Sequence, residues 1–289
     1  MPADGWPASL PDPKMSLKDE VTALMRGVAA TAVTPRFRTL AASEIAEKSP
    51  GEIVTSVDRE AERLLHEGLE LIGIPARIVG EEAAEHQPEL LDGIGEGLVW
   101  LIDPLDGTAN FAAGRAPFGM MVALVEDGVP LAGWILDPVS GRMCHAEKGD
   151  GATCDGVPVR SRPTRDAMPI AALGTHFMTP ERRARIHDLA SERFALVPVP
   201  RCAAESYPRL ALGQNDLVLF QRTLPWDHAA GALFLTEAGG FVTDWNGLPY
   251  RVGGGRGILA AADERLWAAG AEILLGPAAG LIEREDCTT

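Results

Sequence analysis

The sequence lacks an excess of positive charge and any long apolar run, and both absences exclude classes of protein. Its 289 residues carry 26 Lys and Arg against 41 Asp and Glu, a formal net charge of -15. Nucleic acids and anionic membrane surfaces repel such a chain, so neither is expected as a partner. No stretch approaches the roughly 20 apolar residues of a membrane span. We therefore expect a soluble protein.

Cysteine is scarce, and its spacing excludes a common kind of metal site. The four cysteines are Cys144, Cys154, Cys202 and Cys287. They show no C-x-x-C spacing and no paired histidine that would indicate zinc, so we interpret them as reduced, mostly packing thiols. The first residues also lack the basic start and apolar run of a signal peptide. These features predict a cytoplasmic protein.

The chain does have enough apolar residues, 46%, to bury a large core as one big domain or two packed subdomains. A polar, proline-containing stretch at residues 161–166 predicts the boundary between halves. We expect an N-terminal α+β subdomain at residues 1–160, holding most of the functional residues, and a C-terminal α/β subdomain at residues 161–289.

The pattern of apolar residues predicts alternating helices and strands. Helices are expected at residues 15–43, kinked or ended by Pro35, and from Asp58 to a stop at Gly73. Later helices are expected at residues 180–194, 206–212, 226–238 and 264–275. Strands are expected at residues 78–80, 97–102, 120–126, 130–136, 142–148, 152–159, 170–173, 195–199, 216–220 and 258–262, with a hairpin turn at Asp127-Gly128. These elements fit a layered sandwich.

The most informative segment is residues 100–111, WLIDPLDGTANF. An apolar strand leads into Asp103 and Asp106, and Gly107-Thr108 follows where a helix could begin. Carboxylates suit hard divalent cations, and the N–H groups at a helix start suit an anion. Asp-Pro and Asp-Gly are also ordinary turn residues, so the segment alone leaves a plain turn open.

Two further acidic clusters favour the functional interpretation. Glu81 and Glu82 follow a short strand, and adjacent carboxylates repel each other unless a cation or solvent separates them. Asp227 begins a helix of small residues, where a lone Asp is usually a cap. Together the three clusters predict phosphate chemistry with divalent cations. Magnesium is favoured over zinc because the ligand set is all oxygen.

Four motifs in this order resemble the inositol monophosphatase-like family of magnesium-dependent, lithium-sensitive phosphatases. They are residues 48–58, 80–82, 103–111 and 226–231, and the resemblance extends from about Lys48 to the last helix. It implies a layered αβαβα sandwich of the sugar-phosphatase type, a homodimer, and hydrolysis of a small phosphate monoester by metal-activated water.

The resemblance also implies roles for individual residues, with two or three magnesium ions. The metal ligands would be Glu81, Asp103 and the Leu105 carbonyl for one ion, and Asp103, Asp106 and Asp227 for the next. Asp58 would help to hold a third ion or its waters. Catalysis would rest on Asp58, Glu81 and Thr108, with Thr108 orienting the attacking water. The substrate would contact Asp106, Gly107, Thr108, Glu205, Ser206 and Asp227. An alternative for Asp58 is a helix N-cap before Arg59, with Thr55 in a turn.

The substrate itself stays open between several phosphate esters. The family implies inositol monophosphate, but Phe220 stands where inositol-selective relatives carry a carboxylate that contacts sugar hydroxyls. Histidinol phosphate, a 3'(2'),5'-bisphosphate nucleotide and fructose bisphosphate are the alternatives, and Arg222 would suit a second phosphate or a carboxylate. An alternative of another class is a non-catalytic protein that binds a phosphorylated ligand on the same fold.

Overall fold

The computed structural model describes residues 15–49 and 52–281. Cys287, the segment at residues 1–6 and the Pro50-Gly51 pair of the first motif lie outside the described residues. The α-helices are α1 Leu17–Val28, α2 Ser56–Ile72, α3 Glu81–His86, α4 Thr108–Ala112, α5 Pro180–Ser191, α6 Ala203–Ala211, α7 Pro225–Glu237 and α8 Glu264–Leu274. Among the described helices, none has both the length and the apolar content to cross a membrane.

The first large sheet has seven strands in the order β3-β4-β5-β6-β7-β8-β9. The strands are β3 Arg77–Gly80, β4 Leu98–Asp106, β5 Gly119–Glu126, β6 Val129–Leu136, β7 Met143–Glu147, β8 Gly151–Cys154 and β9 Val157–Val159. β3 and β4 are parallel, and the later strands pair antiparallel. Asp127 and Gly128 have φ values of 46° and 77°, as a tight hairpin between β5 and β6 requires, so that predicted turn is confirmed.

The second sheet has five strands in the order β11-β10-β12-β14-β13. They are β10 Ile170–Leu173, β11 Ala195–Val197, β12 Leu217–Phe220, β13 Phe241–Asp244 and β14 Ile258–Ala261. β10 is parallel to both β11 and β12, whereas β14 is antiparallel to β12 and β13. The three parallel neighbours therefore end at the same edge, where ligands commonly bind in open α/β sheets.

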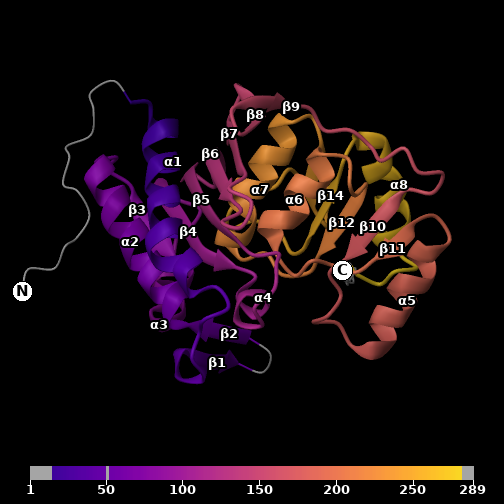
Figure 1. The fold of residues 1–289 in the computed structure, drawn as a ribbon. Helices are drawn as coiled ribbons and strands as arrows, with labels where there is room; N and C mark the ends of the chain where they lie inside the picture. Colours follow the sequence, from indigo (N-terminus) through magenta and orange to yellow (C-terminus); the bar gives the residue numbers. More distant parts are fainter. Residues whose placement is uncertain (1–14, 50–51, 282–289) are drawn as a thin grey trace, which may run out of the picture.

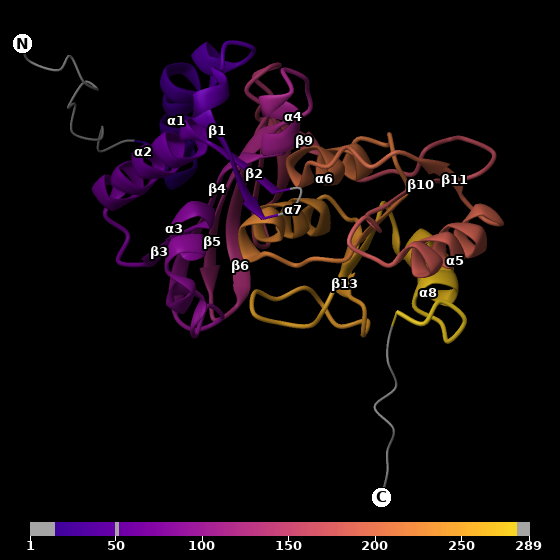
Figure 2. The ribbon, with the colours of Figure 1, turned by 90° about the horizontal axis from the view of Figure 1, so that it is seen from below.

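The elements stack in five layers, which confirms the predicted αβαβα sandwich (Figure 1). α1 and α2 cover one face of the seven-stranded sheet, α6 and α7 lie between the two sheets, and α5 and α8 cover the far face of the second sheet (Figure 2). α7 is apolar around nearly its whole circumference because it is buried against elements on several sides. Gly231 on α7 allows this close packing, since a Cβ there would lie 2.0 Å from the Tyr207 ring.

Several element boundaries differ from the predictions. The helix expected at residues 15–43 ends at Val28 as an α-helix and continues through one π-helical turn and a 3-10 turn, Thr34–Arg36, that contains Pro35. α6 begins at Ala203, earlier than predicted. The hairpin of β1 Ile45–Ser49 and β2 Glu52–Thr55, and strand β13, were not predicted. These short strands carry too few residues for periodicity to identify them.

Candidate functional site

A bulge in β4 lets two aspartates of the Asp-Pro-Leu-Asp segment face the same side. Asp103 pairs with Met121 and Asp106 with Gly119, so two residues of β4 lie opposite one residue of β5. This insertion shifts the alternation of side chains by one position. Leu105 consequently packs toward α1 and α2, while the Asp106 carboxylate accepts a hydrogen bond from α6 on the opposite side of the sheet.

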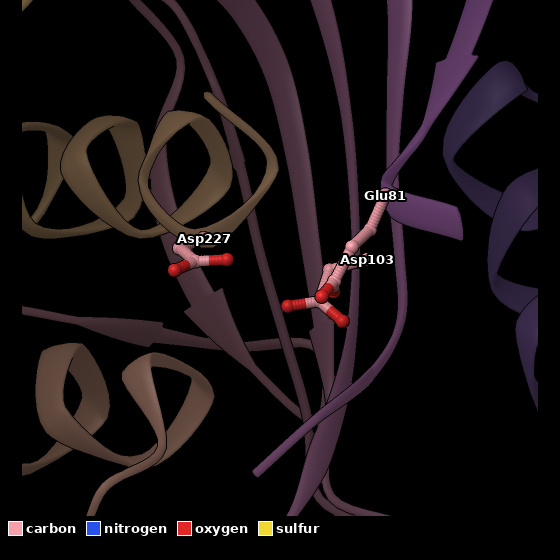
Figure 3. A group of neighbouring side chains, drawn as sticks. All are labelled: Glu81, Asp103 and Asp227. Atoms are coloured by element: carbon pink, nitrogen blue, oxygen red, sulfur yellow. The ribbon is translucent and has the colours of Figure 1, made fainter. Parts of the chain in front are cut away.

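Three carboxylates from three different elements converge at this edge (Figure 3). Glu81 is the first residue of α3, Asp103 lies near the end of β4, and Asp227 lies in the first turn of α7. One carboxylate oxygen from each lies within 4.8 Å of the other two. The structure thus brings together residues from all three acidic clusters of the sequence.

The cluster is electrostatically costly without a cation. Burial, and then the fields of the neighbouring carboxylates, raise the pKa of Glu81 and of Asp103 well above the usual range. Burial and the charge of Asp106 raise the pKa of Asp227 to about 8. Like charges at this spacing cannot all ionise cheaply, so a bound cation would be strongly favoured.

Asp106 lies beside this cluster and is held by the start of α6. Its Oδ2 accepts a hydrogen bond of 2.6 Å from the Ala204 N–H. Burial raises the pKa of Asp106, and hydrogen bonds from backbone N–H groups partly oppose that effect. Gly107 follows with a φ of +83°, and a Cβ there would lie 3.1 Å from the Pro117 carbonyl oxygen. The turn into α4 therefore needs glycine at this position.

Asp58 and Thr108 form a second polar pair behind the cluster. The Thr108 hydroxyl lies 2.8 Å from both Asp58 Oδ1 and the Leu105 carbonyl oxygen. Asp58 Oδ2 accepts hydrogen bonds from the N–H and the hydroxyl of Thr55. The alternative of an Asp58 N-cap is wrong, because Thr55 is the N-cap and Asp58 is the third residue of α2.

Glu62 is a buried residue that the sequence analysis missed and that fixes the start of α3. Its two carboxylate oxygens accept 2.8 Å hydrogen bonds from the N–H groups of Glu82 and Ala83. Gly80 leaves room for this contact, because a Cβ there would lie 2.2 Å from the Glu62 carboxyl carbon. Glu62 lies one helical turn after Asp58, and this i,i+4 spacing was the available signal.

Lys48 supplies positive charge to the same region. Its ammonium lies 2.6 Å from Glu82, 2.9 Å from Glu85 and 3.3 Å from Glu81. Burial lowers the pKa of this ammonium, but the neighbouring carboxylates outweigh burial and raise it. Glu82 therefore pairs with Lys48 and does not belong to the three-carboxylate cluster. Glu81 contacts Lys48 and also belongs to the cluster.

A cavity of about 420 Å³ opens next to the cluster. Acidic residues line it on the side of β4, α3 and α7, and the loops after β10, β11 and β12 also contribute lining residues. This volume suits a small metabolite. Gly107, Thr108 and Ser206, to which the resemblance assigns substrate contacts, line the cavity, and those contacts remain a prediction.

Glu205 does not lie where a residue that contacts the substrate was expected. It is absent from the residues that line the cavity, and its carboxylate forms ion pairs with Arg142 at 2.6 Å and Arg209 at 2.7 Å. It lies on α6 directly before Ser206, but adjacent positions on a helix do not face the same way. The expectation for Glu205 is therefore corrected: this side chain joins α6 to the region of β7.

Phe220 and His228 line the cavity. Phe220 has no carboxylate, and both imidazole nitrogens of His228 are hydrogen-bonded within the protein. Phe220 stacks on Tyr207 with ring centroids 5.2 Å apart. His228 is buried, with Nδ1 3.0 Å from the Tyr207 hydroxyl and Nε2 2.9 Å from the Arg222 carbonyl oxygen. Because that carbonyl only accepts, Nε2 carries the proton in this arrangement and Nδ1 accepts from Tyr207. Burial lowers the pKa of His228 to about 4, so it is neutral near pH 7.

Comparison with known proteins agrees with the observed fold. The model of the inositol monophosphatase family matches residues 17–274. The inositol-1-monophosphatase of Mycobacterium leprae is 36% identical over 226 residues, covering 75% of this chain and 76% of that protein. The fructose-1,6-bisphosphatase/inositol-1-monophosphatase of Thermotoga maritima is 30% identical over 203 residues, covering 70% and 75% of the two chains.

A solved structure of a Thermotoga maritima IMPase superposes with a TM-score of 0.74 at 25% sequence identity. It covers 90% of this chain and 98% of its own. The agreement therefore includes both sheets and the helices between them. From the family model, the relatives and the shared fold, we conclude that the chain belongs to the inositol monophosphatase family of phosphatases.

Proposed function

We propose that this protein is a magnesium-dependent phosphomonoesterase that hydrolyses a small phosphorylated metabolite with water. The observation that carries the proposal is the cluster of Glu81, Asp103 and Asp227, whose carboxylate oxygens lie within 4.8 Å of one another beside a cavity. The pKa of each member is raised, so the cluster favours a cation. All donors are oxygens, which is the ligand type that magnesium prefers.

The residues divide between cation binding and substrate handling. Glu81, Asp103, Asp106, Asp227 and the Leu105 carbonyl would hold two magnesium ions, with Asp58 near a third. When bound, such ions lower the pKa of water and neutralise the phosphate charge. The N–H groups of Gly107 and Thr108 would donate to phosphate oxygens. α4 spans only five residues, so these individual donors matter more than any dipole of the helix.

Thr108 is suited to orient the attacking water. Its single hydroxyl hydrogen is donated to Asp58 Oδ1 or the Leu105 carbonyl oxygen, or is shared between these two acceptors. The lone pairs of the same hydroxyl oxygen are then available to accept from a water molecule. Asp58 acts through Thr108 in this arrangement, since its other oxygen is bonded to Thr55.

Inositol monophosphate is the first substrate to test, because the relative with 36% identity is named for that activity. Fructose bisphosphate follows, because a second relative is named for both activities. Histidinol phosphate and a 3'(2'),5'-bisphosphate nucleotide complete the panel. Phosphate release should require magnesium and stop when a chelator is added.

The same assay distinguishes an enzyme from a binding protein. If a folded, magnesium-loaded sample releases phosphate from no ester of the panel but binds one of them, the non-catalytic alternative is favoured. Lithium should inhibit turnover, and sedimentation should give a homodimer, as the family resemblance implies; each is a separate measurement of a prediction that stands on that resemblance.

A further inference from the structure

Two cysteines face each other across neighbouring strands of the seven-stranded sheet. Cys144 on β7 and Cys154 on β8 are direct partners in the antiparallel register. The next pair along the ladder is hydrogen-bonded, because the Asp155 N–H donates to the Met143 carbonyl oxygen at 2.8 Å. Hydrogen-bonded and non-hydrogen-bonded pairs alternate in such a ladder, so the cysteines occupy a non-hydrogen-bonded pair. Side chains approach each other most closely at pairs of that type.

The geometry allows a disulfide between these two cysteines. Their Sγ atoms lie 3.9 Å apart. The partners of a non-hydrogen-bonded pair have Cα atoms about 4.5 Å apart, and disulfides form at Cα separations of roughly 4.4–6.8 Å. Rotation of the two side chains therefore suffices to bring the sulfurs into bonding distance, and the strands do not have to move.

Contacts at both ends of β8 hold the register that places the cysteines opposite each other. At one end, the Asp155 carboxylate accepts a hydrogen bond of 2.9 Å from the Met143 N–H. At the other end, the Glu237 carboxylate of α7 accepts hydrogen bonds from the N–H groups of Gly149 and Gly151, at 2.9 and 3.0 Å. A slip of one residue would break these contacts, so the two thiols remain paired.

The two thiols differ in exposure and in acidity. Cys144 is fully buried, whereas Cys154 is partly exposed. The Cys144 thiol donates a hydrogen bond to the Cys154 sulfur. This bond lowers the pKa of Cys154 to about 7, and the charge of Arg142 also lowers it, against the effects of burial and of Asp155. The same bond and burial raise the pKa of Cys144. A partly exposed thiol with a lowered pKa is the type that reacts with oxidants.

We propose that Cys144 and Cys154 form a reversible oxidation site, at which a hydroperoxide converts the thiol pair into a disulfide that joins β7 to β8. Cys154 is the attacking thiol and Cys144 is the resolving thiol. Neither cysteine is among the described residues that line the cavity. The proposal therefore concerns a second site and does not depend on the proposed function.

The reaction consumes one hydroperoxide for each disulfide. The Cys154 thiolate attacks an oxygen of the hydroperoxide, the O–O bond breaks, and the leaving alkoxide or hydroxide takes up the proton that Cys154 released. The Cys144 sulfur then attacks the sulfur of the resulting sulfenic acid. The S–S bond forms, the S–O bond breaks, and water leaves with the Cys144 proton. Each sulfur gives up one electron, and the hydroperoxide takes both.

The disulfide would strengthen the outer edge of the sheet. β8 and β9 are the last two strands in the order of the seven-stranded sheet. Edge strands open locally more readily than central strands, because fewer contacts hold them. A covalent bond between β7 and β8 restricts this opening, since it limits the separation of the two strands.

Peptide mapping of the full chain after treatment with hydrogen peroxide tests the pairing. Trypsin cleavage after Lys148 separates the two cysteines into peptides of residues 143–148 and 149–160. Free thiols are blocked with N-ethylmaleimide in denaturant before digestion. We expect these two peptides to be linked without reductant and separated by dithiothreitol. Absence of the linked peptides, or links from either cysteine to Cys202 or Cys287 instead, would overturn the proposal.

Variants assign the roles of the two thiols. In Cys144→Ala, which keeps a small apolar side chain at the buried position, oxidation should stop at a sulfenic acid on Cys154 that dimedone traps. In Cys154→Ser, which changes only a partly exposed position, Cys144 should be oxidised at least about tenfold more slowly. Cys287→Ser is the matched control and should form the disulfide at the native rate. If Cys144 is oxidised equally fast with and without Cys154, the roles assigned here are wrong.

Hydrogen exchange measures the effect on the sheet. Amides of β8 and β9 should exchange about tenfold more slowly in the oxidised protein than in the reduced protein. Amides of β12, in the other sheet, serve as the internal reference. Equal exchange at β8 and β9 in both forms would refute the effect on the edge of the sheet.

Discussion

The contact between Gly80 and Glu62 predicts that the effect of Gly80→Ala on the free energy of unfolding changes sign when Glu62 is replaced. Gly80 has φ -105° and ψ 161°, extended values that alanine adopts without strain. By itself, Gly80→Ala should stabilise the fold by about 0.4–1 kcal/mol, because alanine has less freedom in the unfolded chain. In the native protein, however, the new Cβ would lie 2.2 Å from the Glu62 carboxyl carbon and 2.4 Å from its Oε2. The carboxylate must therefore move.

The cost follows from the two hydrogen bonds that the carboxylate would lose. The N–H groups of Glu82 and Ala83 each donate to Glu62 at 2.8 Å. A buried donor left without its acceptor costs about 1–3 kcal/mol. Ala83 is only partly buried and water can replace its partner, so we expect Gly80→Ala to lower the free energy of unfolding by about 2–4 kcal/mol in all.

The measurement is a double-mutant cycle in urea with chelator present. In the Glu62→Ala background the clashing carboxylate is gone, so adding Gly80→Ala should be neutral or stabilising by up to about 1 kcal/mol. The sign change between backgrounds is the critical result. If Gly80→Ala destabilises both backgrounds equally, the reasoning from the Glu62 contact is wrong and the cost has another source.

The same variants, measured without chelator, test whether Glu62 positions Glu81. Glu81 is the first residue of the helix whose start Glu62 holds, so loosening that start should weaken magnesium binding by about tenfold. Calorimetry on Glu62→Gln is the milder version, because the amide oxygen can still accept one hydrogen bond. Unchanged magnesium affinity in both Glu62 variants would show that α3 keeps Glu81 in place without this contact.

Three further predictions concern the cluster directly. Asp103→Asn should reduce phosphate release by about a thousandfold or more, yet raise the thermal stability of the chelator-treated protein at high pH, because the amide never adds its charge to the ionising carboxylates around it; a lower stability would contradict the electrostatic account. Thr108→Val should lower kcat by about a hundredfold while Thr108→Ser restores most of it, as steady-state kinetics would show; equal rates would exclude the hydroxyl from orienting water. The raised pKa of Asp227, about 8, means that magnesium must displace a proton below that pH. Magnesium affinity measured by calorimetry should therefore rise about tenfold per pH unit up to about pH 8 for each proton released, and a flat profile would contradict this.

The sequence by itself determined the chemistry of the cluster and most of the elements that carry it. Strands ended close to their expected positions because apolar runs and Gly-containing turns are local signals, as at Asp127 and Gly128. The acids Glu81, Asp103 and Asp227 were recognised because each follows a strand end or begins a helix. Their roles as magnesium ligands remain predictions from the motifs, as do the roles of Asp58 and Thr108.

Only the tertiary structure decided which side chains contact one another. Glu205 lay in a plausible stretch of sequence, but the fold pairs it with Arg142, 63 positions away. Lys48 and Glu62 carry no strong local signal, and their contacts with Glu82 depend on how the β1–β2 hairpin and α2 pack near α3. The bulge in β4 turned Asp106 to the same side as Asp103.

The physical reason is the range of the interactions. Secondary structure and turns depend on neighbours a few positions apart, so their signals survive in the sequence. Ion pairs, buried hydrogen bonds and the meeting of loops at a sheet edge depend on residues that the topology brings together across long separations. The loops after β10, β11 and β12 are such a case, because His176, Arg201 and Arg222 line one cavity only after three parallel strands have paired.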